Sequence, residues 1–125
     1  MSGRERVMAA RSYEIAIVNL TDVEFTRKEA HLDHGVWSKD GNYTPPDKIS
    51  TGQTAHFGSE SQGVATGTEG HVIYSSSAGD FRVDWDNPYI GGDSSSAKCP
   101  PSYEKVLSDS KGNDATLKVV FYKKS

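Results

Sequence analysis

Residues 81–86 have the sequence Phe-Arg-Val-Asp-Trp-Asp, in which large apolar and charged residues alternate strictly. Successive side chains of a β-strand point to opposite faces, so Phe81, Val83 and Trp85 share one face and the charged residues share the other. This alternation predicts a strand with one buried face. Pro88 ends the strand, because it lacks an amide hydrogen and restricts the preceding residue to extended geometry.

The same two-residue period recurs on both sides of this segment. A more polar strand is expected around residues 23–27, a short one around 48–50 and a hairpin turn at 78–80, whereas residues 87–102 are rich in Gly, Pro, Ser and Asp and predict a long loop. About seven or eight short strands without a long helix are typical of an all-β sandwich or barrel. We favour a compact antiparallel β-sandwich with little or no helix. The inward-facing residues of the other predicted strands are Tyr13, Ile15, Ile17, Ala55, Phe57, Ser59, Val72, Tyr74, Leu117, Val119 and Phe121.

The length and charge of the chain indicate how many domains it forms and which partners it disfavours. The 125 residues suffice for one domain, so we expect a single β-sandwich domain at 12–125 and a disordered or frayed N-terminal tail at 1–11. There are 14 Lys and Arg against 17 Asp and Glu, for a formal net charge of −3. This balance disfavours binding to a phosphate backbone, which requires clustered positive charge, and we expect no nucleic-acid partner.

The sequence also lacks several segments that would change the class of protein. Cys99 is the single cysteine, which excludes an internal disulfide and a cysteine-based zinc site. The longest apolar runs, at 15–18 and 119–122, are far too short for a transmembrane helix. No secretory signal is readable at the N-terminus, so we expect synthesis in the cytoplasm.

The chain carries no recognisable catalytic or metal-binding motif. It has no Gly-x-Ser-x-Gly elbow, no phosphate-binding Gly-x-x-x-x-Gly-Lys loop and no His-Glu-x-x-His pair. His31 and Asp33 would point to one side of a strand and His34 to the other, so these three residues diverge. We therefore predict no enzyme activity, no cofactor and no metal site.

Several aromatic residues fall at strand ends or in loops. Trp85 lies at the end of its predicted strand, Tyr89 follows in the next loop, and Trp37 and Tyr43 occupy loop-like segments. Such residues either cap a core or form a rim of amphipathic rings suited to a membrane–water interface or a choline-type cation. Both interpretations fit the pattern.

Three blocks of sequence resemble a known family. Residues 32–37 (Leu-Asp-His-Gly-Val-Trp), 59–70 (Ser-Glu-Ser-Gln-Gly-Val-Ala-Thr-Gly-Thr-Glu-Gly) and 86–91 (Asp-Asn-Pro-Tyr-Ile-Gly) resemble aegerolysins in order and spacing. The resemblance spans about residues 12–96, and the closing strand at 115–122 fits more loosely. It is closest to the small aegerolysin-like component of bacterial binary insecticidal crystal toxins, and it extends to the actinoporin-like sandwiches.

This resemblance implies a β-sandwich that binds target-cell membrane lipids, possibly of the sphingolipid type, after its release from the producing cell. It further implies insecticidal or cytolytic pore formation with a larger second toxin component, and a possible homo-oligomer on membranes. The chain departs from the family in its short polar N-terminus, which lacks the amphipathic helix of actinoporins, and in Asp86, which replaces a serine that faces phosphocholine. The candidate lipid or head-group contacts are Trp37, Tyr43, Trp85, Asp86, Pro88 and Tyr89.

A different class of function also fits the aromatic and acidic residues. In a carbohydrate-binding lectin on a related sandwich, Trp85 and Tyr89 would stack on a sugar and Asp86 would accept hydrogen bonds from its hydroxyl groups. A third alternative, an intracellular structural protein without a ligand, is permitted by the single cysteine and the lack of a readable signal peptide.

Overall fold

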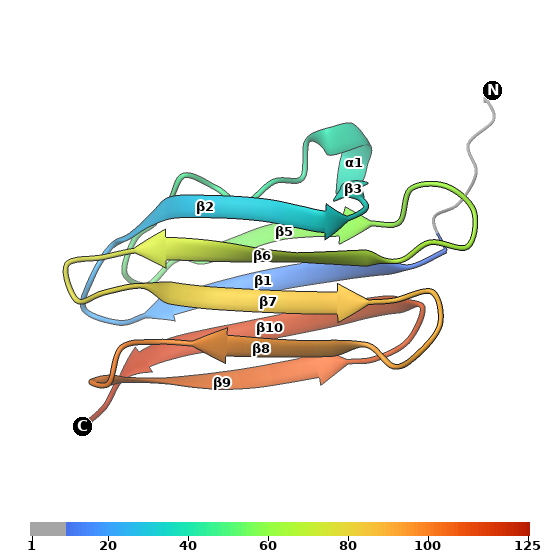
Figure 1. The fold of residues 1–125 in the computed structure, drawn as a ribbon. Coiled ribbons are helices and arrows are strands. Elements are labelled where there is room, and N and C mark those ends of the chain that lie inside the picture. Colours follow the sequence, from blue (N-terminus) through green and yellow to red (C-terminus); the bar gives the residue numbers. More distant parts are fainter. Residues whose placement is uncertain (1–9) are drawn as a thin grey trace.

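The computed structural model describes residues 10–125, which form two five-stranded sheets packed face to face (Figure 1). The all-β sandwich predicted from the alternation is confirmed. Sheet A contains, in spatial order, β3 (Val36–Trp37), β5 (Thr54–Glu60), β1 (Ser12–Leu20), β10 (Asp114–Lys123) and β9 (Tyr103–Ser110). Sheet B contains β4 (Lys48–Ile49), β2 (Phe25–His34), β6 (Thr68–Ser75), β7 (Phe81–Asn87) and β8 (Ser94–Lys98).

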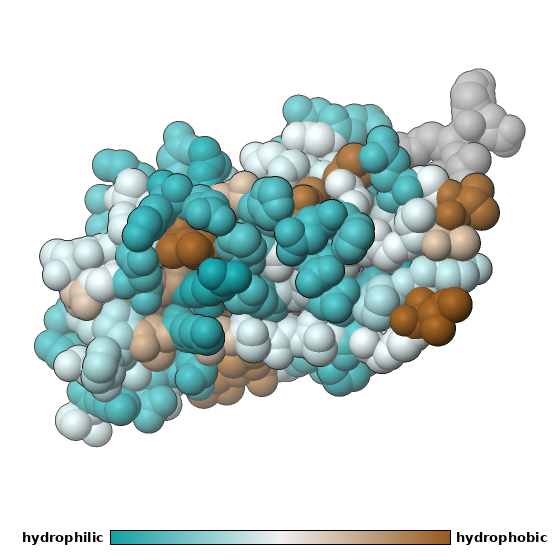
Figure 2. All heavy atoms as spheres, viewed as in Figure 1, coloured by the Kyte–Doolittle hydropathy of each residue, from teal (hydrophilic) through white to brown (hydrophobic). Residues whose placement is uncertain are grey.

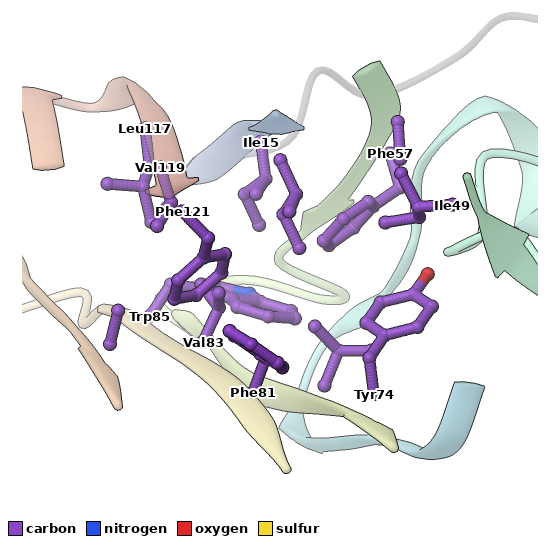
Figure 3. Close-up of a cluster of buried hydrophobic side chains, with 14 of the residues drawn as sticks. Ile15, Ile49, Phe57, Tyr74, Phe81, Val83, Trp85, Leu117, Val119 and Phe121 are labelled. Carbon is purple, nitrogen blue, oxygen red and sulfur yellow. The ribbon is translucent and has the colours of Figure 1, made fainter. Parts of the chain in front are cut away.

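The core lies between the sheets and is built mainly from aromatic rings. In β7 the residues alternate between buried and partly exposed along the whole strand, as predicted. The Phe81 ring stacks on Phe25 with ring centroids 4.4 Å apart and meets Phe121 of the opposite sheet edge-on at 5.1 Å. Figure 3 shows Phe81 and Phe121 pointing toward each other from the two sheets. Such offset and edge-on pairs contribute beyond their buried area.

The structure corrects the strand pattern in three places. β8 lies inside the predicted loop at 87–102, and its only buried residue is Ala97, so no alternation of large apolar side chains reveals it. β2 continues to His34, well beyond the predicted segment at 23–27. One pair of neighbouring strands, β1 and β10, is parallel, whereas the other pairs in both sheets are antiparallel.

The connections gather at the two ends of the sandwich. At one end, loop 61–67 joins β5 to β6, loop 88–93 joins β7 to β8, and residues 111–113 join β9 to β10 (Figure 1). The expected tail at 1–11 falls largely outside the described residues, but its last residue, Arg11, is held at this end. The helix content is the single turn α1 (Ser38–Gly41), and no helix among residues 10–125 is long and apolar enough to cross a bilayer.

Candidate functional site

The end of the sandwich formed by loops 61–67 and 88–93, which we term the tip, presents apolar side chains to solvent. Val64 is 90% exposed and Ile90 85% exposed, and the neighbouring Tyr89 is 41% exposed. Figure 2 shows hydrophobic spheres at this end, over the positions that the two loops occupy in Figure 1. Aliphatic side chains at the ends of two adjacent loops form a small apolar surface that is available for burial in an apolar environment.

The two loops of the tip approach each other closely through their backbones. Gly67 lies so close to the second loop that a Cβ there would be 2.6 Å from the Asn87 carbonyl oxygen and 2.7 Å from Pro88 Cα. The buried Asn87 side chain places Nδ2 within 2.9–3.0 Å of the carbonyl oxygens of Ser12, Gly112 and Asn113. The loop that carries Ile90 therefore starts from a fixed point.

Arg11 holds the Tyr89 side of the tip. Its Nε donates to the Pro88 carbonyl at 3.2 Å, its Nη2 donates to the Tyr89 carbonyl at 2.7 Å, and its guanidinium lies 4.8 Å from the centre of the Tyr89 ring. A cation over an aromatic face is attracted by the quadrupole of the ring. Sequence reasoning assigned Arg11 to the tail, because none of these contacts leaves a local signal.

A pocket of about 350 Å³ lies beside the tip. Glu69 and Asp86 face each other directly across β6 and β7, and His34 approaches Glu69 at 3.9 Å. Partial burial, followed by repulsion from Asp86 and Asp33, raises the pKa of Glu69, and burial raises the pKa of Asp86. The pocket is lined by His34, Thr66, Gly67, Thr68, Glu69, Asp86, Pro88 and Tyr89.

The structure brings only part of the predicted site together. Asp86, Pro88 and Tyr89 share the pocket, but Trp85 is 1% exposed, and its Nε1 donates to the buried Ser59 Oγ at 2.9 Å. Trp85 faces the core because the alternation of β7 directs every second side chain inward. It therefore cannot contact a lipid or a sugar in this conformation, contrary to the expectation from its place at a strand end.

Trp37 and Tyr43 do not line the pocket that contains Tyr89. Trp37 is partly buried against the core, with its ring centroid 6.2 Å from that of Trp85. The Tyr43 ring packs on Gly58 of sheet A, and its hydroxyl donates to the Glu14 carboxylate. Both aromatic residues support the sandwich rather than forming a rim with Tyr89.

Two residues of the tip, Val64 and Ile90, were missed. Each is an isolated apolar residue next to a glycine with positive φ, Gly63 (90°) and Gly91 (109°). An aliphatic residue beside a turn glycine has no partner within its own loop, and this is the local signal that could have identified both positions.

Histidine and acidic side chains of sheet B lie close to one another on its outer face. His31 Nε2 lies 3.1 Å from Asp33 Oδ1, and His71 Nε2 lies 2.6 Å from Glu29 Oε2. Within residues 10–125, no three His, Cys, Asp or Glu side chains are arranged to hold a metal ion.

Comparison with known proteins identifies the class of fold. No family model matches the chain. The solved structure of the lipid binding protein Nakanori superposes with a TM-score of 0.77 over 96% of this chain and 74% of that chain, at 16% sequence identity. The protein therefore shares the β-sandwich fold of a lipid binding protein.

A curated sequence relative adds a second match. An uncharacterized protein of Dictyostelium discoideum is 33% identical over 111 residues, which are 86% of this chain and 10% of that protein. The chain thus spans about a tenth of the length of this relative.

Proposed function

We propose that this protein binds membrane lipids, with the tip as the part that enters the bilayer surface. The observation that carries the proposal is the pair of almost fully exposed aliphatic side chains, Val64 and Ile90, on two loops whose backbones pack closely at Gly67. Burial of such side chains in an apolar phase is favourable by about 1.5–3 kcal/mol each. The fold that the chain shares with a lipid binding protein supports this proposal.

The aromatic part of the tip suits the headgroup layer. Tyr89 combines an apolar ring with a hydroxyl, a combination that favours the boundary between hydrocarbon and water. The ring is held by Arg11, so it is oriented before a membrane is met. Val64 and Ile90 would then lie deeper than Tyr89, in the acyl region.

We further propose that this binding serves a toxin of the aegerolysin type. In this role the protein would recognise sphingolipid-type head groups and act with a larger second component in insecticidal or cytolytic pore formation, with a homo-oligomer on the membrane as one possible assembly. It would be made in the cytoplasm and act after release. The three blocks of sequence at 32–37, 59–70 and 86–91 support this part of the proposal, and two of them contribute the tip loops.

A vesicle panel tests the proposal. The purified chain is incubated with vesicles of phosphatidylcholine alone, with added sphingolipid and sterol, and with anionic lipid, and co-sedimentation and dye release are measured. We expect binding to at least one mixture, and efficient release only when a larger partner is present. Absence of binding to every mixture and to target-cell membranes would refute the proposal.

A glycan array, run with the same protein, distinguishes the lectin hypothesis. Saturable sugar binding that competes with binding to cells would favour it over lipid binding. Burial of Trp85 removes one of the two rings on which the lectin hypothesis depends.

A further inference from the structure

The outer face of sheet A carries an apolar surface far from the tip loops. The side chains that face outward from β1, β9 and β10 become apolar toward the end of the sandwich opposite the tip. Leu20 is 55% exposed, Val106 53% and Tyr122 38%, whereas Ala16, Val18 and Val120 are partly buried. We refer to these six residues as the sheet A patch.

The strand register places the patch in rows across the sheet. Val18, Val120 and Val106 lie side by side in one row, and Leu20, Tyr122 and Glu104 form the next row toward the far end. Ala16, Lys118 and Ser108 form the row on the tip side of the valines. The valine row is thus the centre of the surface, with Glu104 at one corner and Lys118 on the opposite side of the row.

The opposite sheet has an outer face of a different character. Its central strands present Glu69, His71, Arg82, Asp84 and Asp86 around a polar groove of about 550 Å³. Figure 2, in which the strands of sheet B are nearer to the viewer, shows a largely hydrophilic surface over them. An apolar patch on one face of a sandwich whose other face is charged marks an interaction surface.

We propose that the sheet A patch is the contact surface between two copies of this chain, related by a two-fold axis that runs across the strands along the valine row. This axis places Val106 opposite Val106, and Leu20 opposite Ala16, of the second copy. It also places Tyr122 over the Lys118 stem and brings Glu104 next to Lys118. The apolar residues thus meet apolar residues while the two charges are complementary, as a self-complementary interface requires.

The Tyr43 side chain, which forms an overhang above the outer face of sheet A, favours this axis over one that runs along the strands. The Tyr43 ring rises over Gly58 and reaches Glu14, so it covers the tip-side end of the face. An axis along the strands would bring this overhang against the second copy's sheet A, at the same position along the strands. The axis across the strands instead places the overhang beyond Leu20, the last residue of β1, where no strand of the second copy stands in its way.

The proposed dimer has a defined size and geometry. The patch is smaller than the roughly 20–30 residues per side of a standard interface, so we expect a weak dimer that is populated at high protein concentration. The two tips point in opposite directions. The dimer does not depend on lipid binding, and its formation in solution is tested without lipid.

Cross-linking from single cysteines tests the axis. In a Cys99→Ser background, Val106→Cys is treated with a bismaleimide whose span matches the spacing of about 10 Å between packed sheets. Ser110→Cys is the matched control, because it lies on the same strand and face but about 26 Å from its symmetry mate in the proposed dimer. We expect covalent dimers from Val106→Cys and none from Ser110→Cys, whereas equal yields from both would overturn the proposed axis.

Sedimentation equilibrium and charge reversal test the contact itself. We expect Leu20→Lys to raise the dissociation constant of the dimer by at least about tenfold. Lys118→Glu and Glu104→Lys should each weaken the dimer, and the double variant should restore it. A wild-type chain that stays monomeric up to about 1 mM would overturn the proposal. A monomeric chain that loses vesicle binding on Leu20→Lys would overturn it as well, by assigning the patch to the membrane.

Discussion

Replacing Ile90 by serine tests whether the tip enters the bilayer, and the exposure of the side chain sets the expected size of the effect. Ile90 is 85% exposed, so nearly all of its apolar surface remains available for burial in a membrane. Loss of that burial costs about 2 kcal/mol, which is about a 30-fold fall in the vesicle partition coefficient. Val64→Ser should cost about 1.5 kcal/mol by the same reasoning, and the double variant about 3.5 kcal/mol if the two sites act independently.

Vesicle titration followed by sedimentation measures these partition coefficients. Thermal unfolding must be measured in parallel, because substitution of such exposed residues should change the free energy of unfolding by no more than about 0.5 kcal/mol. Val106→Ser is the control, since it removes an exposed valine from the outer face of sheet A. If Ile90→Ser binds vesicles as the wild type does, or if Val106→Ser loses as much binding, the tip does not insert.

Three further variants, the last a double one, probe the support of the tip, the core and the acidic pair. Gly67→Ala should lower both the melting temperature and vesicle binding, because its Cβ would be 2.6 Å from the Asn87 carbonyl oxygen; unchanged values would show that the loops can separate freely. Trp85→Ala should cost about 3–5 kcal/mol in urea unfolding, because it empties a fully buried site, and a loss below about 1 kcal/mol would contradict the assigned packing. Glu69 and Asp86 have pKa values raised by burial, so the folded state holds their protons more tightly than the unfolded state does. Stability therefore falls as pH rises from the ordinary pKa of these groups through the raised one, and Glu69→Gln with Asp86→Asn should raise the melting temperature at neutral pH and flatten this part of the pH profile.

The sequence predicted those strands in which apolar and polar residues alternate within the strand itself. In β7 apolar residues occupy the first three inward positions and only the last, Asn87, is polar, so the alternation identifies the strand without its neighbours. β9 lacks this signal, because its inward Asp109 accepts a hydrogen bond from the Tyr13 hydroxyl at 2.8 Å and one from Ser95. A polar residue that is satisfied from two other strands cannot be recognised as inward-facing from its own segment.

The candidate site likewise contains residues whose placement could be predicted from their own segment and residues whose placement could not. Asp86, Pro88 and Tyr89 are neighbours in sequence and also share a pocket, so their grouping was predictable. Trp37 differs, because its partly buried ring packs on Phe57 and Trp85, which lie on other strands. Tertiary packing, rather than residue type, decided which aromatic side chains remained exposed.

The polar contacts beneath the tip bear on how two aliphatic residues could suffice for the proposed membrane binding. Ordering a flexible loop costs about 1–2 kcal/mol per residue in backbone entropy, which would consume the gain from burying Val64 or Ile90. Here that ordering accompanies folding, since Asn87 fixes the start of the second loop, Arg11 holds its next two carbonyls, and Gly67 lets the first loop pack directly on it. In the proposed binding, the membrane would meet loops that are already supported at these points, so more of the transfer free energy of Val64 and Ile90 would remain as affinity.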